Sequence, residues 1–152
     1  MARNGGVAVA RYCIAGAISD TLSGPNERVR VGTLAQPPDL PGVLLRRSGD
    51  TDLLEQVGGT YCVYQVEWEA LLVAGPFPGS DGVQELLDRW VACIGSPTAL
   101  QSAAEHPEWP TQLAAPVVLD IGAEQLYELG GREFFACTVR IEAQTEFEAI
   151  QQ

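Results

Sequence analysis

Residues 60–75, TYCVYQVEWEALLVAG, carry the most regular alternation of apolar and polar positions in the chain. One parity is largely apolar and consists of Cys62, Tyr64, Val66, Trp68, Ala70 and Leu72. The other parity contains Gln65, Glu67 and Glu69. Because side chains alternate between the two faces of a strand, this pattern predicts a long strand over 60–73 with one wet face.

A second alternating segment lies at the C-terminal end of the chain. Residues 117–129 read as a strand that Gly122 bends or bulges, and Gly130-Gly131 predicts a tight turn. In the following segment, 132–147, alternate side chains are expected to point inward and outward. The inward set is Phe135, Cys137, Val139, Ile141 and Ala143, and the outward set is Thr138, Arg140, Glu142 and Gln144. If this strand pairs with 60–73, Glu67, Glu69, Arg140 and Glu142 form a charged, wet surface.

Two shorter strands are expected before residue 60. RVRVGTL, 28–34, alternates Arg with Val, so Val29 and Val31 should face inward. The proline-rich segment after it predicts an extended connection, and GVLLRRS, 42–48, predicts the next strand. Residues 49–59 are polar and bracketed by glycines, so we expect a long loop with Leu53 and Leu54 at its centre.

Helical spacing of apolar residues occurs in two places. Residues 6–22 predict a first helix that Gly24-Pro25 ends. A second helix, capped by Ser80 or Asp81, carries an apolar stripe over 83–94 and stops at Gly95. A short helix should follow Pro97, and 105–116 should form an irregular connection around Trp109.

This order of elements predicts an α+β fold in a single domain over 1–152. Strands with one wet face indicate a mostly antiparallel β-sheet, and the helices should pack on one face of it. The inward sides of 60–73 and 132–144 would form the floor beneath the 83–94 stripe.

Composition narrows the possible functions. The chain is 46% hydrophobic and 19% charged, as expected of a folded domain, and no apolar run is long enough for a membrane span. The formal net charge is −11, and all nine basic residues are arginine. Such an acidic chain lacks the basic surface that binds nucleic-acid phosphates, so we expect no specific DNA binding and no membrane association.

Candidate catalytic groups are few. His106, the one histidine, lies between Glu105 and Glu108 and could act as a general base or metal ligand, but we favour a solvated loop histidine. The four cysteines, Cys13, Cys62, Cys93 and Cys137, fit no zinc or redox spacing. We interpret them as reduced core thiols, and a disulfide between two of them stays open. With no catalytic motif present, we expect a protein that is not an enzyme and needs no cofactor or metal.

Charged residues concentrate near residue 50. Asp50, Asp52 and Glu55 have part of the spacing of a calcium loop, but the central Gly and the final Glu are missing, so a solvated acidic loop is favoured. Arg46 and Arg47 precede them and could pair with Asp50 and Asp52, within the chain or between subunits. Exposed pairs of this kind add little to folding but can set the register between partners.

The layout resembles the tail terminator family of long-tailed, siphovirus-type bacteriophages. The likeness lies in the order of elements over about residues 7–146. An N-terminal helix leads to RVRVGTL, then to the entry LPGVLLR, the long strand YCVYQVEWEALLVAG, the helix DGVQELLDRWVACIG and the closing strand FFACTVRIEAQTE.

The resemblance implies a structural virion protein. It would form a homo-hexameric ring at the head-proximal end of the tail tube, end tube polymerisation and join the tail to the head–tail connector or head-closure protein. DNA would pass through an acidic lumen without specific binding. The expected location is the head–tail junction of the virion, after assembly in the host cytoplasm.

Contact residues are expected in two segments. The first is 46–55, with Arg46, Arg47, Asp50, Asp52, Glu55 and the paired leucines Leu53 and Leu54, which could instead fold back onto the core. The second surrounds Trp109, because tryptophan is a common interface anchor. Two alternatives stay open: another phage neck protein, such as a head-closure or tail-completion protein, and a small α+β protein-binding module.

Overall fold

The long strand at 60–73 is the centre of the observed sheet. In the computed structural model it is β3 (Tyr61–Pro76), flanked by β2 (Gly42–Val57) and β6 (Arg132–Glu148). The structure describes residues 5–25, 28–32, 41–57, 61–76, 81–110 and 113–148; for 5–6, 50–52, 54–57, 61, 76, 81, 129 and 146–148 it describes the backbone alone. The alternation holds, since Val66, Trp68, Ala70 and Leu72 are at most 1% exposed.

The described residues form a sheet of six strands in the order β1-β2-β3-β6-β4, with β5 also pairing with β6. The short strands are β1 (Arg30–Gly32), β4 (Val117–Ile121) and β5 (Gln125–Leu129). Every pairing is antiparallel except that of β1 with β2. The predicted break at Gly122 is confirmed, because β4 ends before it and β5 begins after it.

Three helices occur in the described part of the chain: α1 (Gly5–Leu22), α2 (Asp81–Ile94) and the short α3 (Gln101–Ala104). The helices predicted over 6–22 and 83–94 are confirmed. The short helix begins at residue 101 and not at Pro97, because a series of turns occupies 95–100.

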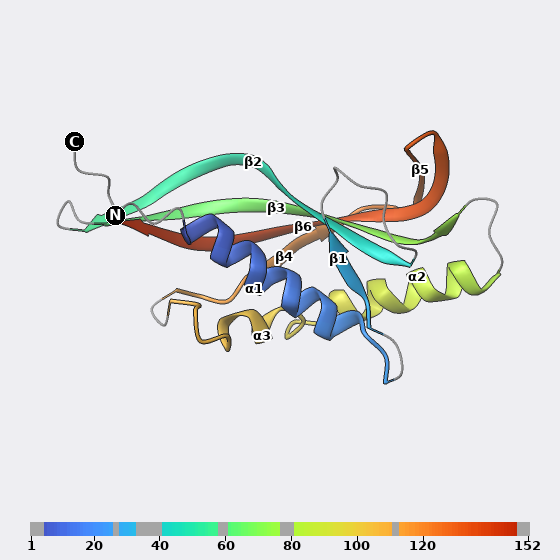
Figure 1. Cartoon of the computed structure of the whole chain (residues 1–152), viewed down its shortest axis with the longest axis horizontal. Coiled ribbons are helices and arrows are strands. Elements are labelled where there is room, and N and C mark those ends of the chain that lie inside the picture. The colour runs from blue at the N-terminus through green and yellow to red at the C-terminus, as the bar shows by residue number, and fades with distance from the viewer. Residues whose placement is uncertain are drawn as a thin grey trace.

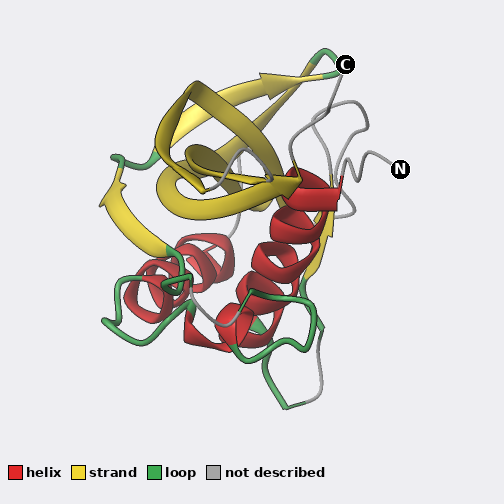
Figure 2. Ribbon diagram, turned by 90° about the vertical axis from the view of Figure 1, so that its left-hand side faces the viewer, coloured by secondary structure: helices red, strands yellow, loops and turns green. Residues whose placement is uncertain are grey.

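The main core lies between α1, α2 and one face of the sheet (Figure 1). Ile14 and Ile18 of α1 and Leu87 and Trp90 of α2 are all at most 1% exposed. They share one cluster with the inward residues of β3 and with Cys137, Val139 and Ile141 of β6. Burying each large apolar side chain contributes about 1.5–3 kcal/mol, so this contact fixes the helices on the sheet. Figure 2 shows the twisted sheet on one side and the helices on the other.

The predicted loop over 49–59 is wrong. Residues 49–57 continue β2 and pair with β3 as far as Val57↔Tyr61, with register shifts between Ser48 and Thr51 and between Leu53 and Glu55. Gly49 makes the first shift possible, because its φ of 66° lies in the left-handed region that glycine enters without strain. The polar, glycine-bracketed segment is therefore a bulged strand, held in place by its long partner.

A second, smaller core lies on the opposite face of the sheet. Leu44, Leu71, Val73, Phe134 and Ala136 are buried there, and Tyr127 of β5 packs against them. Gly130 and Gly131, with φ of 59° and 78°, form the tight turn that returns the chain from β5 to β6. At this end the sheet therefore buries apolar residues on both faces.

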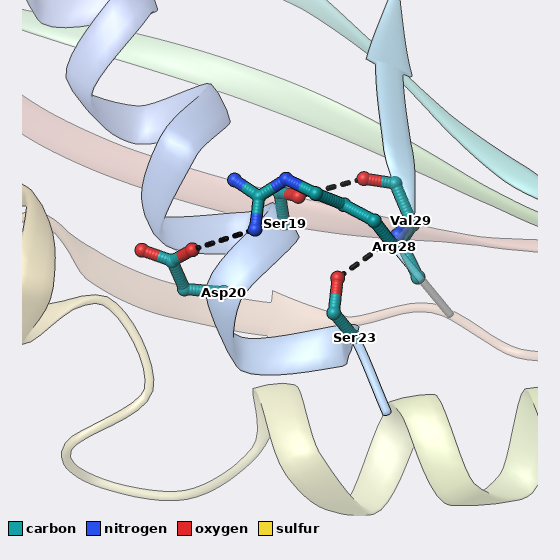
Figure 3. Close-up of polar contacts among 5 residues, drawn as sticks. All are labelled: Ser19, Asp20, Ser23, Arg28 and Val29. Carbon is teal, nitrogen blue, oxygen red and sulfur yellow. Dashed lines mark hydrogen bonds and ion pairs between the residues drawn. The ribbon is translucent and has the colours of Figure 1, made fainter. Parts of the chain in front are cut away.

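Ser19 of α1 and Ser23, which follows the helix, hold the segment that enters β1 (Figure 3). Ser19 donates a hydrogen bond to the carbonyl of Val29 at 2.7 Å, and the N–H of Val29 donates to Ser23 Oγ at 2.9 Å. Both backbone groups of Val29 are thus satisfied by side chains near the end of α1. An exposed ion pair between Arg28 and Asp20 at 3.3 Å lies beside them.

The fold class is a mixed α+β fold with a mostly antiparallel sheet, as the sequence predicts. The predicted strand over 28–34 is confirmed in a shorter form, with Val29 buried and Val31 half-buried; residues 33–34 lie outside the described ranges.

Replacing Trp90 tests the main core. Trp90→Ala should lower the free energy of unfolding by about 3–5 kcal/mol, because it leaves a cavity between α2 and the sheet. Trp90→Phe should cost less: the ring stays, and the substitution removes an indole N–H that is buried without a hydrogen-bond partner among the described residues. Urea unfolding measures both, with the exposed neighbour Arg89→Ala as control. Equal losses for Trp90→Ala and Arg89→Ala would contradict this packing.

Candidate contact surface

The outward faces of four strands carry a line of alternating charge. Arg46 of β2 lies opposite Glu69 of β3, Glu69 lies opposite Arg140 of β6, and Arg140 lies opposite Asp120 of β4. We call Arg46, Glu69, Arg140 and Asp120 the charged row. Its signs alternate across the sheet, positive at β2 and negative at β4. The predicted charged surface on β3 and β6 is therefore confirmed, and β2 and β4 extend it.

Arg140 holds the middle of this surface. Its guanidinium binds Asp120 at 2.6 Å and, diagonally, Glu67 at 2.5 Å. Hydrogen bonds to Glu67 and to Asp120 raise the pKa of Arg140, so the group stays charged. Glu67 lies directly opposite Glu142, a like-charge pair that would be unfavourable alone. The diagonal bond from Arg140 offsets that repulsion.

The predicted pairing of Arg46 with Asp50 and Asp52 stays a prediction, because the side chains of both acidic residues lie outside the described residues. The Arg46 guanidinium binds Glu69, the residue directly opposite it on β3, at 2.9 Å. Arg47 is exposed and lies on the other face, opposite Trp68. Asp50, Asp52 and Glu55 belong to β2, not to a loop, and their side chains lie outside the described residues.

Leu53 is an exposed apolar residue of the β2 strand. It is 55% exposed and lies opposite Tyr64. The expectation that it is exposed is confirmed, but it stands within a strand and not at a loop tip. The side chain of Leu54 lies outside the described residues.

The expectation that Trp109 anchors a contact at the surface is wrong. Trp109 is 3% exposed and belongs to the main core, and its indole N–H donates to the Leu113 carbonyl at 3.4 Å. The prolines around it suggested an exposed loop, but the irregular connection folds against the helices. An aromatic residue in such a segment therefore serves the core here.

The sequence reasoning missed exposed apolar residues on β4 and β5, of which those on β4 flank Asp120 of the charged row. Val117 and Leu119 of β4 are 51% and 41% exposed, and Leu126 of β5 is 48% exposed. Leu119 is the extra residue at a bulge between Val118 and Asp120. The run VVLD was a usable signal, because an edge strand with a single charge is unusual in a monomeric protein.

His106 and the cysteines do not form an activated pair. The His106 ring packs edge-on against Tyr12 with centroids 5.3 Å apart, and its Nδ1 accepts a hydrogen bond from the N–H of Glu108 at 3.1 Å. Burial, and then the charge of Glu108, raise the pKa of Cys13, so its thiol stays protonated at neutral pH. Both residues line an open groove of about 860 Å³ beside α1, and the raised pKa of Cys13 disfavours the thiolate that a thiolate–imidazole pair requires.

All four cysteines are free thiols, so none forms the disulfide that the sequence left open. Within the described residues, no group of three or more His, Cys, Asp or Glu side chains is placed to hold a metal ion. Among the helices described here, none has both the length and the apolar character needed to cross a membrane.

No protein-family model matches the chain, and no curated protein matches it.

The buried thiol of Cys137 predicts a loss of stability at alkaline pH. Burial, with a smaller effect of Glu124, raises the pKa of Cys137 from 9.0 to about 11. Below pH 9 the thiol is protonated in both the folded and the unfolded chain, so its contribution is complete. Between pH 9 and 11 the unfolded chain ionises first, and stability is lost as pH rises.

Urea unfolding of the native chain and of Cys137→Ala from pH 7 to 10.5 measures this effect. The native chain should lose stability more steeply above pH 9 than Cys137→Ala, while Cys93→Ala, at a half-buried position, should follow the native chain. Identical pH profiles for all three proteins would rule out the buried thiol as the cause.

Proposed function

We propose that this chain is a tail-terminator-like virion protein. It forms a ring at the head-proximal end of a phage tail tube, stops tube polymerisation and joins the tail to the head connector. In this arrangement the helices cover one face of the sheet and leave the opposite face and the edges for neighbouring subunits. The order of elements, α1 and β1 before the long β2 and β3, then α2, and β6 last, is the order on which the resemblance rests.

The observation that carries the proposal is the slab formed by the three long strands β2, β3 and β6, whose outer face carries alternating charges. β2 and β3 each span 16 residues and β6 spans 17, well beyond the usual five or six of a strand. Their paired ends extend past the N-terminal end of α1 (Figure 1). A rigid slab of this length, carrying the charged row, suits contacts between identical subunits, where charges fix register more than they add affinity.

Leu53 supports the same reading. An exposed large apolar side chain on a strand at the side of the slab is suited to a contact with a neighbouring subunit or with the tube. Ring subunits meet through two different surfaces, so a contact residue on one side of the domain requires a complementary surface on the other side.

The acidity of the chain fits a passage for DNA. A net charge of −11 means that a ring of identical copies repels phosphate wherever carboxylates line its opening. DNA would then slide through without being held.

Ring formation can be tested with the purified chain and with the tail tube protein of the same virus. Light scattering after size exclusion should give a mass near six times the 16.3 kDa of one chain, either free or once tube ends are added. Electron microscopy should show rings at one end of each tube, and tubes should stop lengthening. A protein that stays monomeric with tubes and leaves their growth unchanged would refute the proposal. Binding to the connector without binding to the tube would instead indicate a head-closure role.

Leu53→Glu should weaken this assembly at least about tenfold, because it places a charge in an apolar contact. Its thermal stability should stay close to that of the native chain, since the side chain is already exposed. Tyr12→Glu, at a 65% exposed position on α1, is the matched control and should assemble normally. Equal assembly by both variants would exclude Leu53 from the contact.

The DNA expectation has a separate test. Fluorescence anisotropy with a labelled duplex in about 50 mM salt should show no binding, since low salt exposes any phosphate contacts that exist. Measurable binding whose affinity falls as salt is added would contradict an acidic passage that does not bind DNA.

A further inference from the structure

Among the described residues, the sheet has two open edges, on opposite sides of the domain. β1 pairs with β2 only over Gly42–Leu44, so from Leu45 to Val57 the described chain provides β2 with β3 as its one strand neighbour. On the other side, within the part of the chain that the structure describes, β4 pairs with β6 alone. An open edge presents unpaired backbone N–H and C=O groups, which another strand can satisfy.

The charged row ends at these two edges with opposite signs. Arg46 lies on β2 at one edge, and Asp120 lies on β4 at the other. A second copy placed beside the first, in the same orientation, brings its Arg46 next to Asp120. The alternation of charge then continues unbroken from one copy into the next.

Strand directions agree with this placement. β2, β3, β6 and β4 alternate in direction, because each neighbouring pair is antiparallel. β4 of one copy therefore meets β2 of the next in the antiparallel sense. The side of the sheet that carries α1 and α2 also stays the same from copy to copy.

In this placement, the residues of β4 next to the charged row also lie on the same face of the sheet as the β2 residues opposite them in the second copy. With Leu119 left out as the bulged residue, Val117 would lie opposite Ser48 on the outer face. Val118 would lie opposite Arg47 on the helix face. Each pair joins residues that already face the same side of their own sheet, and a one-residue slip would reverse this match.

Exposed apolar side chains indicate that the β4 edge is covered by a partner when the protein is assembled. Val117 and Leu119 are 51% and 41% exposed on a strand with one charge, whereas edge strands of monomeric proteins are usually protected by charges or proline. A groove of about 480 Å³ runs along β4 on the side of the α2–α3 turn, lined by Gly95, Ser96, Pro97 and residues of β4.

We propose that copies of this chain join by continuing one β-sheet, with β4 of each copy antiparallel to β2 of the next and Asp120 beside Arg46. This inference rests on the proposed function, whose ring needs a contact between two different surfaces of each subunit. The partner it assigns is a second copy of the same chain.

Cross-linking tests the register directly. Residues opposite each other in an antiparallel pair have Cβ atoms close enough for a disulfide, so S48C/V117C should form a ladder of covalent oligomers under mild oxidation. The amount of cross-linking that the native cysteines cause by themselves is measured with the native chain and with the single variants S48C and V117C. A double variant with no more cross-linked product than the single variants would overturn the proposal.

Charge reversal tests the meeting of Arg46 with Asp120. In the S48C/V117C background, D120R or R46D alone should lower the ladder yield by about tenfold, and R46D/D120R should recover most of it. D20R and R28D break the exposed ion pair between α1 and the segment that enters β1, and as matched controls they should leave the yield unchanged. Equal losses in the single and the double reversals would count against the pairing.

The two proposals fail in different ways. A ladder from a protein that does not cap tubes supports the shared sheet and refutes the tail function. Rings that cap tubes without a ladder refute the shared sheet and keep the tail function. A protein that forms neither ladder nor ring refutes both.

Discussion

The structure depends on the pairing of β3 with β6. The two strands are in register along nearly their whole length, from Tyr61↔Glu148 to Pro76↔Phe134, with one irregularity near Gly75. This register places Trp68 beside Ile141 and Leu72 beside Cys137, which together form the apolar floor for α1 and α2. The same register sets Glu69 beside Arg140 on the other face. Since side chains alternate, one pairing determines both the core and the charged surface.

The two faces of this sheet have different energetic roles. The helix face removes large apolar side chains from water, and that burial supplies most of the stabilisation. The outer face carries ion pairs that solvent partly screens, so they contribute little to folding. Charges that are not needed for stability are available to distinguish one neighbouring strand from another. The fold can therefore keep its core unchanged while its outer face is matched to a partner.

The sequence predicts those parts of the fold that have a regular period. Alternation over 60–73 and 132–147 and the stripe over 83–94 gave strands and helices close to those observed, because burial imposes these periods. The failures lie where tertiary partners decide. Residues 49–57 are polar and contain Gly49, yet they form a strand because β3 offers them a partner along that length. Trp109 lies between prolines, yet it is buried because the helices leave a place for it. The charged row was predicted only in part for the same reason: Asp120 joins Arg140 through a strand pairing that no local pattern reports.

The attachment of Val29 to Ser19 and Ser23 has a consequence for how the sheet can grow. A parallel strand of three residues is too short to hold its own alignment, and it could slide along β2 if nothing tethered it. The serines clamp it to a helix that is itself packed on the sheet. The fixed β1 strand thereby covers the β2 edge over Gly42–Leu44 and prevents amyloid-like strand addition there. The rest of the β2 edge stays accessible to an ordered strand partner.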